Sequence, residues 1–411
     1  MIPKLDDYKR RWQLPSDDVI KPGLTRILQA LQQLGQPEQS LQVVHFAGTN
    51  GKGSTLTFVE HIARAYGLTV GKFMSPCIVD VHDQISIDGQ PISRRQMDAV
   101  FQQMAEAKLH HLLTDFELLT CAALLHFRNE QVDLVLLEAG MGGREDSTNV
   151  AIPIVSVIPS IALEHTNFLG TTLAQIAGHK AGIIKQNKPT VIGRLPKEAY
   201  EVVKAEAKQQ NSSLSILGEG FEVDGTTYRH LVRQIEINHL ERRLLGMHQG
   251  ENMAVAITAF LEVASALSLK LDTAAIQQGV YNAQVAGRFE QVSENVYFDG
   301  AHNPASIAAL VQTIQQQFPN EQVEIIIGML ADKDVVKAIQ LLEPIASKFI
   351  FVDFMNLRAM KAQHMLEIPS TVGGTIMTLE EVAHYLKRGH STKIVTGSLY
   401  LLSELREVCS L

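Results

Sequence analysis

Cysteine and tryptophan are scarce in this chain of 411 residues, which has three cysteines and one tryptophan. Cys77, Cys121 and Cys409 lie far apart and lack the spacing of a zinc site. The sequence therefore predicts neither a disulfide framework nor a structural metal. Free thiols without a pairing pattern are typical of a reducing compartment, so we expect a cytoplasmic protein.

The chain also lacks an excess of positive charge, because its formal net charge is −8. A surface that binds nucleic-acid backbones or anionic membranes needs such an excess, so we expect neither partner. Long apolar runs are absent too: the most apolar run, residues 152–163, is interrupted by Pro153 and Pro159. We therefore expect no signal peptide and no membrane span, and any anionic ligand must be held by a local site.

Short apolar runs alternate with amphipathic stretches, which is the pattern of a mainly parallel α/β sheet covered by helices. The first part predicts strands at residues 41–46, 69–73, 132–138, 154–158 and 189–192, and helices at 54–66, 93–111, 114–128 and 173–182. Residues 213–243 predict a small antiparallel addition, followed by helices at 250–267 and 272–282. The alternation then restarts, with strands at 296–298, 323–327, 349–352 and 393–396 and helices at 304–318, 335–342, 379–386 and 399–408. We therefore expect two α/β domains, residues 1–282 and 283–411.

One segment, "VHFAGTNGKGST" at residues 44–55, is similar to a phosphate-binding loop without matching the common pattern G-x-x-x-x-G-K-[ST]. Phe46 stands where that pattern has its first glycine, and Gly53 follows the lysine. A strand, a glycine-rich loop and a helix together still present backbone N–H groups and a helix dipole to an anion. Lys52 adds an ammonium group, and Ser54 adds a hydroxyl that can bind Mg²⁺. The alternative is a plain turn between a strand and a helix.

Other candidate residues follow predicted strands or lie among small neighbours. Glu138 ends an apolar strand, where open α/β sheets bind their ligands, and Arg144 follows in a glycine-rich loop. His165 follows the next strand, and Lys180 lies among small residues that favour its burial. Asp299, at a later strand end, has no evident structural task. A glycine loop with a solvated salt pair is the alternative for Glu138 and Arg144, and ordinary structural roles are the alternative for the others.

Ten segments, in order along the chain, resemble the folylpolyglutamate synthase and dihydrofolate synthase family of Mur-type ligases. They read "HFAGTNGKGST", "SPCIVDVHDQISIDGQPIS", "TDFELLTCAAL", "LEAGMGGREDSTN", "ALEHTNFLGTTLAQIAGHKAGIIK", "GMHQGEN", "AGRFE", "DGAHNP", "GMLADKD" and "TGSLYLLSELR". The resemblance covers nearly the whole chain and implies a P-loop-containing N-terminal ATPase domain with a smaller Rossmann-like C-terminal α/β domain. It implies a monomeric ligase that uses ATP to activate a folate carboxylate as an acyl phosphate, which L-glutamate then attacks. Whether dihydropteroate is also an acceptor is left open.

The resemblance also implies roles for individual residues. Nucleotide contacts are implied for Asn50, Gly51, Lys52, Gly53, Ser54, Asn252, Arg288 and Asp299. Two Mg²⁺ sites are implied at Ser54, Ser75, Glu138, His165 and Lys180, with Lys180 carried as a carbamate. Substrate contacts are implied for Thr114, Phe116, Glu117, Arg144 and Ser398, and catalytic roles for Lys52, Lys180 and His302. The "TDFE" of residues 114–117 is equally well explained as a helix capping box.

The chain departs from the family pattern at several positions. Cys77 stands where the family usually has histidine, Gln84 where it has arginine, and Glu145 where it has an apolar residue. The first two changes lie where contacts to the pterin-bearing substrate are expected. Two alternatives compete with a folate ligase: a Mur-type ligase with another acceptor, and a non-catalytic nucleotide-binding relative. The first normally adds an N-terminal domain, for which we expect too little chain before Leu41, and the second has no need for both metal positions.

Overall fold

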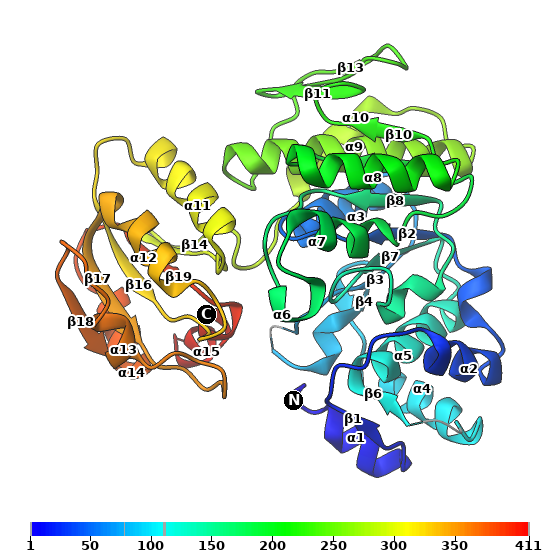
Figure 1. Cartoon of the computed structure of the whole chain (residues 1–411), viewed down its shortest axis with the longest axis horizontal. Helices are drawn as coiled ribbons and strands as arrows, with labels where there is room; N and C mark the ends of the chain where they lie inside the picture. Colours follow the sequence, from blue (N-terminus) through cyan, green and yellow to red (C-terminus); the bar gives the residue numbers. More distant parts are fainter. Residues whose placement is uncertain (1, 78, 110–111, 410–411) are drawn as a thin grey trace. The chain divides into compact units, whose positions relative to one another are not determined.

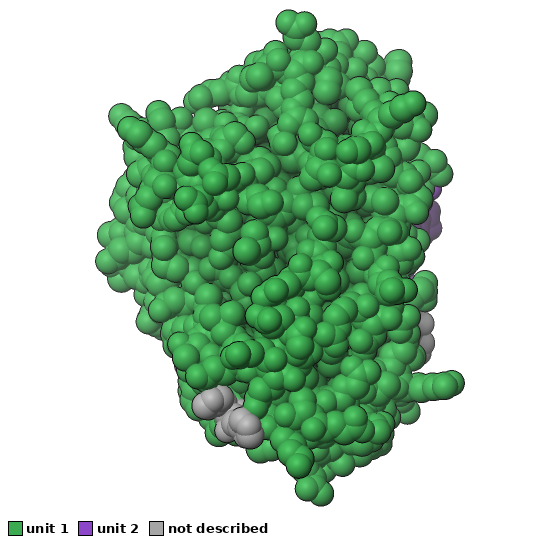
Figure 2. Space-filling view, turned by 90° about the vertical axis from the view of Figure 1, so that its right-hand side faces the viewer, with its two compact units in different colours: residues 1–242, 250–283 green, residues 243–249, 284–411 purple. Residues whose placement is uncertain are grey.

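The computed structural model of the chain describes residues 2–77, 79–109 and 112–409 (Figure 1). The chain forms two compact units, residues 1–242 with 250–283 and residues 243–249 with 284–411 (Figure 2). We call them unit 1 and unit 2. Both are mixed α/β, so the predicted fold class is confirmed. The short segment 243–249 groups with unit 2, although the chain on both sides of it belongs to unit 1.

Unit 1 is built on a large sheet that is parallel except at one edge. Its described strands, in sheet order, are β10 (Leu214–Ile216), β9 (Thr190–Ile192), β8 (Val155–Ile158), β2 (Val43–Phe46), β7 (Leu134–Glu138), β3 (Val70–Phe73), β4 (Ile85–Ile87) and β5 (Gln90–Pro91). Figure 1 shows the central strands of this series side by side. Every residue of β2, β7 and β8 is buried, as expected for parallel strands with both faces covered.

The strand register brings the carboxyl ends of β2, β7 and β8, and the loops that follow them, to one edge of this sheet. Phe46, the last residue of β2, lies opposite Glu138 of β7 on one side and Val157 of β8 on the other. The chain leaves β2 for β3, beyond β7, whereas β8 lies on the opposite side of β2. Such a reversal of strand order opens a crevice at the carboxyl ends of the strands, where α/β sheets bind ligands.

The helices of unit 1 pack on the sheet and on one another. Their bounds are α1 (Leu5–Trp12), α2 (Thr25–Gln33), α3 (Lys52–Ala65), α4 (Arg94–Glu106), α5 (Asp115–Asn129), α6 (Thr166–Leu169), α7 (Leu173–Ala181), α8 (Lys197–Gln209), α9 (Met247–Ala266) and α10 (Thr273–Asn282). α3 packs against α10, and α7 packs against α8. α3 begins two residues earlier than predicted. α4 ends at Glu106, short of the predicted residue 111, and residues 110–111 lie outside the described part.

Two small sheets complete unit 1. β1 (Ser16–Asp17) pairs in parallel with β6 (Leu113–Thr114), and this two-residue ladder joins segments about a hundred residues apart. β11 (Phe221–Asp224), β12 (Thr227–His230) and β13 (Ile235–Ile237) form the antiparallel addition that the sequence predicts. Among the described residues no helix is both long and apolar enough to cross a bilayer.

Unit 2 has its own parallel sheet with one antiparallel edge strand. Its described strands, in sheet order, are β14 (Glu290–Ser293), β15 (Val296–Phe298), β19 (Lys393–Thr396), β16 (Val323–Ile327), β17 (Ala346–Val352) and β18 (Gly374–Met377). Its helices are α11 (Pro304–Gln317), α12 (Val335–Leu342), α13 (Ala362–Leu366), α14 (Leu379–Leu386) and α15 (Leu399–Cys409). Asp299 and its neighbours follow β15, at the carboxyl edge of this sheet.

Candidate active site

The glycine-rich loop between β2 and α3 forms a tight turn that ends directly in the helix. Gly51 caps α3 with φ at 81°, a conformation that side chains disfavour. A Cβ atom at Gly51 would lie 2.4 Å from Oδ1 of Asn252, so the loop and Asn252 are in close contact. Lys52, Gly53 and Ser54 occupy the first turn of α3. Their backbone N–H groups are those that a helix N-terminus leaves for an anion.

A second segment supports the loop from behind. Thr49 donates its backbone N–H to the carbonyl of Ser160 at 2.9 Å and its hydroxyl to the carbonyl of Ala162 at 3.0 Å. Asn50 exchanges two hydrogen bonds with the hydroxyl of Ser160, at 3.0 and 2.9 Å. These bonds use the polar groups on one side of the loop and fix its path. The loop is therefore shaped by the end of β8 before any ligand binds.

Lys52 and Glu138 meet at the edge where β2 and β7 end. Nζ of Lys52 lies 3.6 Å from Oε1 of Glu138 and donates to the carbonyl of Gly48 at 3.0 Å. Both side chains are largely buried, and Ser54 is a buried residue of the first turn of α3, two positions after Lys52. An ammonium and a carboxylate therefore meet where the sheet opens its crevice, and a hydroxyl follows in the helix that begins there. A triphosphate with a divalent cation needs these groups.

Lys180 lies in α7 and is almost completely buried, with 2% of its surface exposed. Burial and the positive charge of Lys52 lower the pKa of Lys180 to about 7, although Glu164 and Asp146 oppose the shift. An ordinary lysine titrates more than three units higher, so a substantial fraction of Lys180 is a neutral amine near neutral pH. His165, another expected ligand, begins α6 in the left-handed conformation with φ at 50°. Across the described ranges, no three His, Cys, Asp or Glu residues form a metal-binding group.

A cavity of about 300 Å³, which we call the acceptor pocket, brings four of the expected residues together. Ser75, Thr114, Phe116 and Glu117 all line it, with Gly140 and His179. Phe116 stacks on Phe73 at 5.4 Å between ring centroids, and a Cβ at Gly140 would lie 2.9 Å from the Phe116 ring. The pocket thus has a flat aromatic wall beside a glycine loop.

Arg144 does not line the acceptor pocket, although its neighbours Gly143 and Glu145 do. Its guanidinium binds Glu206 of α8 at 2.6 Å and the carbonyl of Gly178 at 3.3 Å. The arginine therefore ties its loop to α7 and α8. The expectation that Arg144 binds substrate remains a prediction that requires these bonds to break.

The "TDFE" segment forms the capping box and lines the acceptor pocket as well. Thr114 Oγ1 accepts the N–H of Glu117 at 3.2 Å, and Glu117 accepts the N–H of Thr114 at 2.7 Å. Glu117 also pairs with Arg26 at 3.1 Å, while Asp115 pairs with Lys9 at 2.8 Å. The acidic groups of the segment are thus engaged within the chain.

Unit 2 holds a second cluster of expected residues after β15. Asp299 accepts the N–H of Phe289 at 2.8 Å and of Ala301 at 2.9 Å, so the expectation that it lacks a structural task is wrong. Burial raises the pKa of Asp299, although the charge of Arg288 opposes the shift. Nδ1 of His302 lies 2.8 Å from the carbonyl of Gly300, to which it must donate. Ser398 is buried on the adjacent loop and accepts the N–H of Tyr400.

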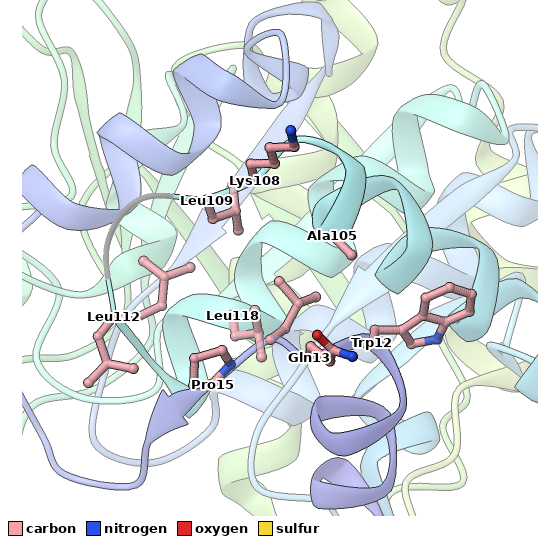
Figure 3. Close-up of a pocket in the computed structure, with 10 residues that line it drawn as sticks. Trp12, Gln13, Pro15, Ala105, Lys108, Leu109, Leu112 and Leu118 are labelled. Atoms are coloured by element: carbon pink, nitrogen blue, oxygen red, sulfur yellow. The ribbon is translucent and has the colours of Figure 1, made fainter.

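The sequence did not indicate that the N-terminal segment contributes to the site. Residues 17–23 and Ile2 line the acceptor pocket, and none of them belongs to a recognisable sequence motif. A second cavity, of about 400 Å³, is lined by Trp12, Gln13 and Pro15 just before β1, together with Lys108, Leu112 and Leu118 (Figure 3). The β1–β6 ladder therefore has a cavity next to each of its ends. Residues 17–23 form one wall of the acceptor pocket. The Pro22-Gly23 pair before α2 is the one local sequence feature that indicates a change of chain direction there.

The fold and the loop define a Mur-type ligase, and comparisons with known proteins agree. Residues 46–260 match the Mur ligase middle domain, and residues 287–398 match the Mur ligase glutamate ligase domain. The chain is 34% identical over 409 residues to the dihydrofolate synthase/folylpolyglutamate synthase of Bacillus subtilis, covering 94% of this chain and 95% of that one. It belongs to the folylpolyglutamate synthase and dihydrofolate synthase family.

Other relatives extend the comparison to solved structures. The folylpolyglutamate synthase of Lacticaseibacillus casei is 36% identical over 325 residues, which cover 75% of this chain and 76% of that one. The structure of Escherichia coli FolC with DHPP and ADP has a TM-score of 0.90 at 29% identity, covering 99% and 98% of the two chains. A complex of a folylpolyglutamate synthase with AMPPCP and folate has a TM-score of 0.85 at 32% identity, covering 98% of each chain.

Proposed function

We propose that this chain is an ATP-dependent ligase that joins the amine of L-glutamate to the terminal carboxylate of a reduced folate. The observation that carries the proposal is the pair of Lys52 and Glu138 at one sheet edge, at the start of the helix that also holds Ser54. It occurs in a chain that matches folylpolyglutamate synthases over nearly its whole length. We assign ATP binding to residues 1–282 and glutamate ligation to residues 283–411.

The residues of the loop suit phosphoryl transfer. The N–H groups of residues 51–54 and the positive end of α3 would hold the phosphates, with Asn252 against the loop. Lys52, which now donates to Gly48, would turn its ammonium to the phosphate oxygens and offset their charge. A carboxylate oxygen of the folate attacks the γ-phosphorus, the bond to ADP breaks, and an acyl phosphate forms.

The second step joins glutamate to the activated carbonyl. Its amine attacks the acyl carbon and loses a proton, the C–O bond breaks, and inorganic phosphate leaves. We assign the nucleotide and the incoming glutamate partly to unit 2, through Arg288, Asp299, His302 and Ser398. In the tautomer that donates from Nδ1 to Gly300, the Nε2 atom of His302 is an acceptor and can take that proton.

Magnesium fits the donors at the loop. Mg²⁺ prefers carboxylate, hydroxyl and phosphate oxygens, and Glu138 and Ser54 supply the first two. We assign a second site to Ser75 and His165 with a carbamate on Lys180. The neutral amine is the form that combines with CO₂, and the pKa of about 7 makes that form available. When bound, the metal would offset the negative charge of the triphosphate.

The test of the function supplies purified protein with ATP, Mg²⁺ and labelled L-glutamate, and with either tetrahydrofolate or dihydropteroate. We expect ADP release that depends on both glutamate and a pteridine acceptor, with the label transferred to the acceptor. Transfer to dihydropteroate would add dihydrofolate synthase activity, which the name of the Bacillus subtilis relative includes. ADP binding without any label transfer would favour a non-catalytic relative.

Substitutions of two lysines, one in the loop and one on the surface, test whether label transfer depends on the site. Lys52→Ala should abolish label transfer, and Lys208→Ala, on the exposed side of α8, should leave it unchanged. Full turnover by the Lys52 variant would refute the role of the loop. For Lys180, an intact mass measured in bicarbonate should exceed the calculated mass by one CO₂, and an unmodified mass under those conditions would argue against the carbamate. We also expect a monomer, which light scattering can check.

A further inference from the structure

A side chain of helix α1 reaches a residue of the acceptor pocket that lies about a hundred positions later in the sequence. Nζ of Lys9 lies 2.8 Å from Oδ1 of Asp115, the first residue of α5. Asp115 lines the acceptor pocket. Both side chains are largely buried, at 14% and 9% exposed, so water weakens the pair far less than a surface salt bridge.

The same lysine also binds the strand that leads into the pocket wall. Nζ of Lys9 donates to the carbonyl of Ser16 at 3.1 Å, and the Ser16 hydroxyl donates to Asp115 at 2.5 Å. Lys9, Ser16 and Asp115 thus form a closed triangle of hydrogen bonds. Ser16 is the first residue of β1, and the next residues, 17–23, form a wall of the acceptor pocket.

Two sets of contacts hold that wall. In its later part Arg26, which pairs with Glu117, donates to the carbonyl of Lys21, and Lys21 pairs with Asp17. At its start β1 contributes only two residues to its ladder, and a short ladder supplies few backbone hydrogen bonds. Val19 and Ile20 of the wall are about half exposed, so they bury little apolar surface. The second cavity lies next to the chain just before β1 (Figure 3). The start of the wall, where the chain leaves β1, therefore depends on the triangle.

We propose that Lys9 is a positioning residue for the acceptor, because through Asp115 and Ser16 it holds residues 17–23 in place as a wall of the acceptor pocket. The inference rests on the proposed function, with the folate acceptor placed in this pocket because the expected substrate residues Thr114, Phe116 and Glu117 line it. ATP binding depends on a different set of residues, around Lys52. Loss of the triangle should therefore affect the acceptor and leave the nucleotide unaffected.

Lys9→Met is the main test, because methionine keeps most of the volume of the lysine side chain and removes its charge. In the glutamate-transfer assay we expect the KM for the folate acceptor to rise about tenfold, while the KM for ATP stays within about twofold of wild type. Lys9→Arg should restore most of the affinity, since a guanidinium can bind both Asp115 and the Ser16 carbonyl. Arg10→Met is the matched control, because Arg10 is exposed on the same helix and its guanidinium bonds to the Asp6 carbonyl and the Asp7 carboxylate, away from the pocket.

Ser16→Ala provides a second, milder test that keeps the ion pair. It removes one bond of the triangle and should raise the KM for the acceptor about threefold. Hydrogen exchange of the amides of residues 17–23 should become faster in both variants. The inference is overturned if the acceptor KM of Ser16→Ala and of any folded Lys9→Met protein stays at the wild-type value, or if the KM for ATP rises equally. Label transfer by the wild-type protein tests the proposed function separately.

Discussion

His45 makes the stability of unit 1 sensitive to acid, and the size of the effect follows from its surroundings. The residue lies in β2, one position before the loop-forming end of the strand, and its side chain is fully buried. Nε2 lies 2.8 Å from Oγ1 of Thr148, whereas Nδ1 has no hydrogen-bond partner among the described residues. Burial, with a smaller contribution from the charge of Lys185, lowers the pKa of His45 from 6.5 to about 3.

The sign of the effect follows from which state binds the proton. Above pH 6.5, His45 is neutral in both the folded and the unfolded chain and adds no pH dependence. As the pH falls below that value, the unfolded chain binds a proton at His45 that the folded chain does not bind, so the free energy of unfolding decreases. The slope is about 1.4 kcal/mol for each pH unit, which gives a loss of about 2 kcal/mol at about pH 5.

His45→Gln should remove this contribution, because glutamine can keep a bond to Thr148 and does not titrate. Urea unfolding at about pH 7.5, 6 and 5 measures the free energy of unfolding of unit 1, followed by a probe that reports on that unit alone. We expect the wild type to lose about 2 kcal/mol more than the variant over this range. His364→Gln, at an exposed position of α13, is the control and should follow the wild type. Parallel curves for wild type and His45→Gln would refute the reasoning.

Two further substitutions test the loop and the acceptor pocket. Gly51→Ala should weaken ADP binding more than tenfold in calorimetry, because the new Cβ would face Asn252 Oδ1 at 2.4 Å in a backbone conformation with positive φ. Wild-type affinity in that variant would show that the loop changes shape when it binds nucleotide. Phe116→Leu should raise the KM for the folate acceptor about fivefold and leave the KM for ATP unchanged, because it removes an aromatic wall stacked on Phe73. Equal effects on both constants would place Phe116 outside the acceptor site.

The sheets were predictable from sequence because their strands are continuous apolar runs with both faces buried. β2, β7 and β8 each lie within a predicted range, and the loop after β2 lies beside Glu138 because parallel strands end at one edge. The predicted start of α3 was two residues late, since Gly51 in the left-handed conformation is the cap and no side chain caps the helix. A capping rule based on side chains does not anticipate such a start.

Long-range side-chain partners were not predictable in the same way. Arg144 pairs with Glu206 of α8, a helix that the sequence did not predict, and its contact with substrate stays a prediction. Asp299 was expected to lack a structural task, yet it accepts the N–H of Ala301 in its own loop and the N–H of Phe289, which precedes β14. In both cases the residue type indicated a charged interaction. The partner depended on the fold, which a local pattern does not contain.

The "TDFE" segment shows how structural and functional roles combine at the acceptor pocket. Thr114 and Glu117 cap α5, and Glu117 and Asp115 also bind basic residues of the N-terminal segment. A ligand that displaced these bonds would also release that segment. Under the proposed function, the aromatic face of Phe116 and the wall of residues 17–23 are two surfaces that can select the acceptor. Substitutions in the N-terminal residues should consequently change which acceptor this chain prefers, whereas nucleotide binding should depend on the loop after β2.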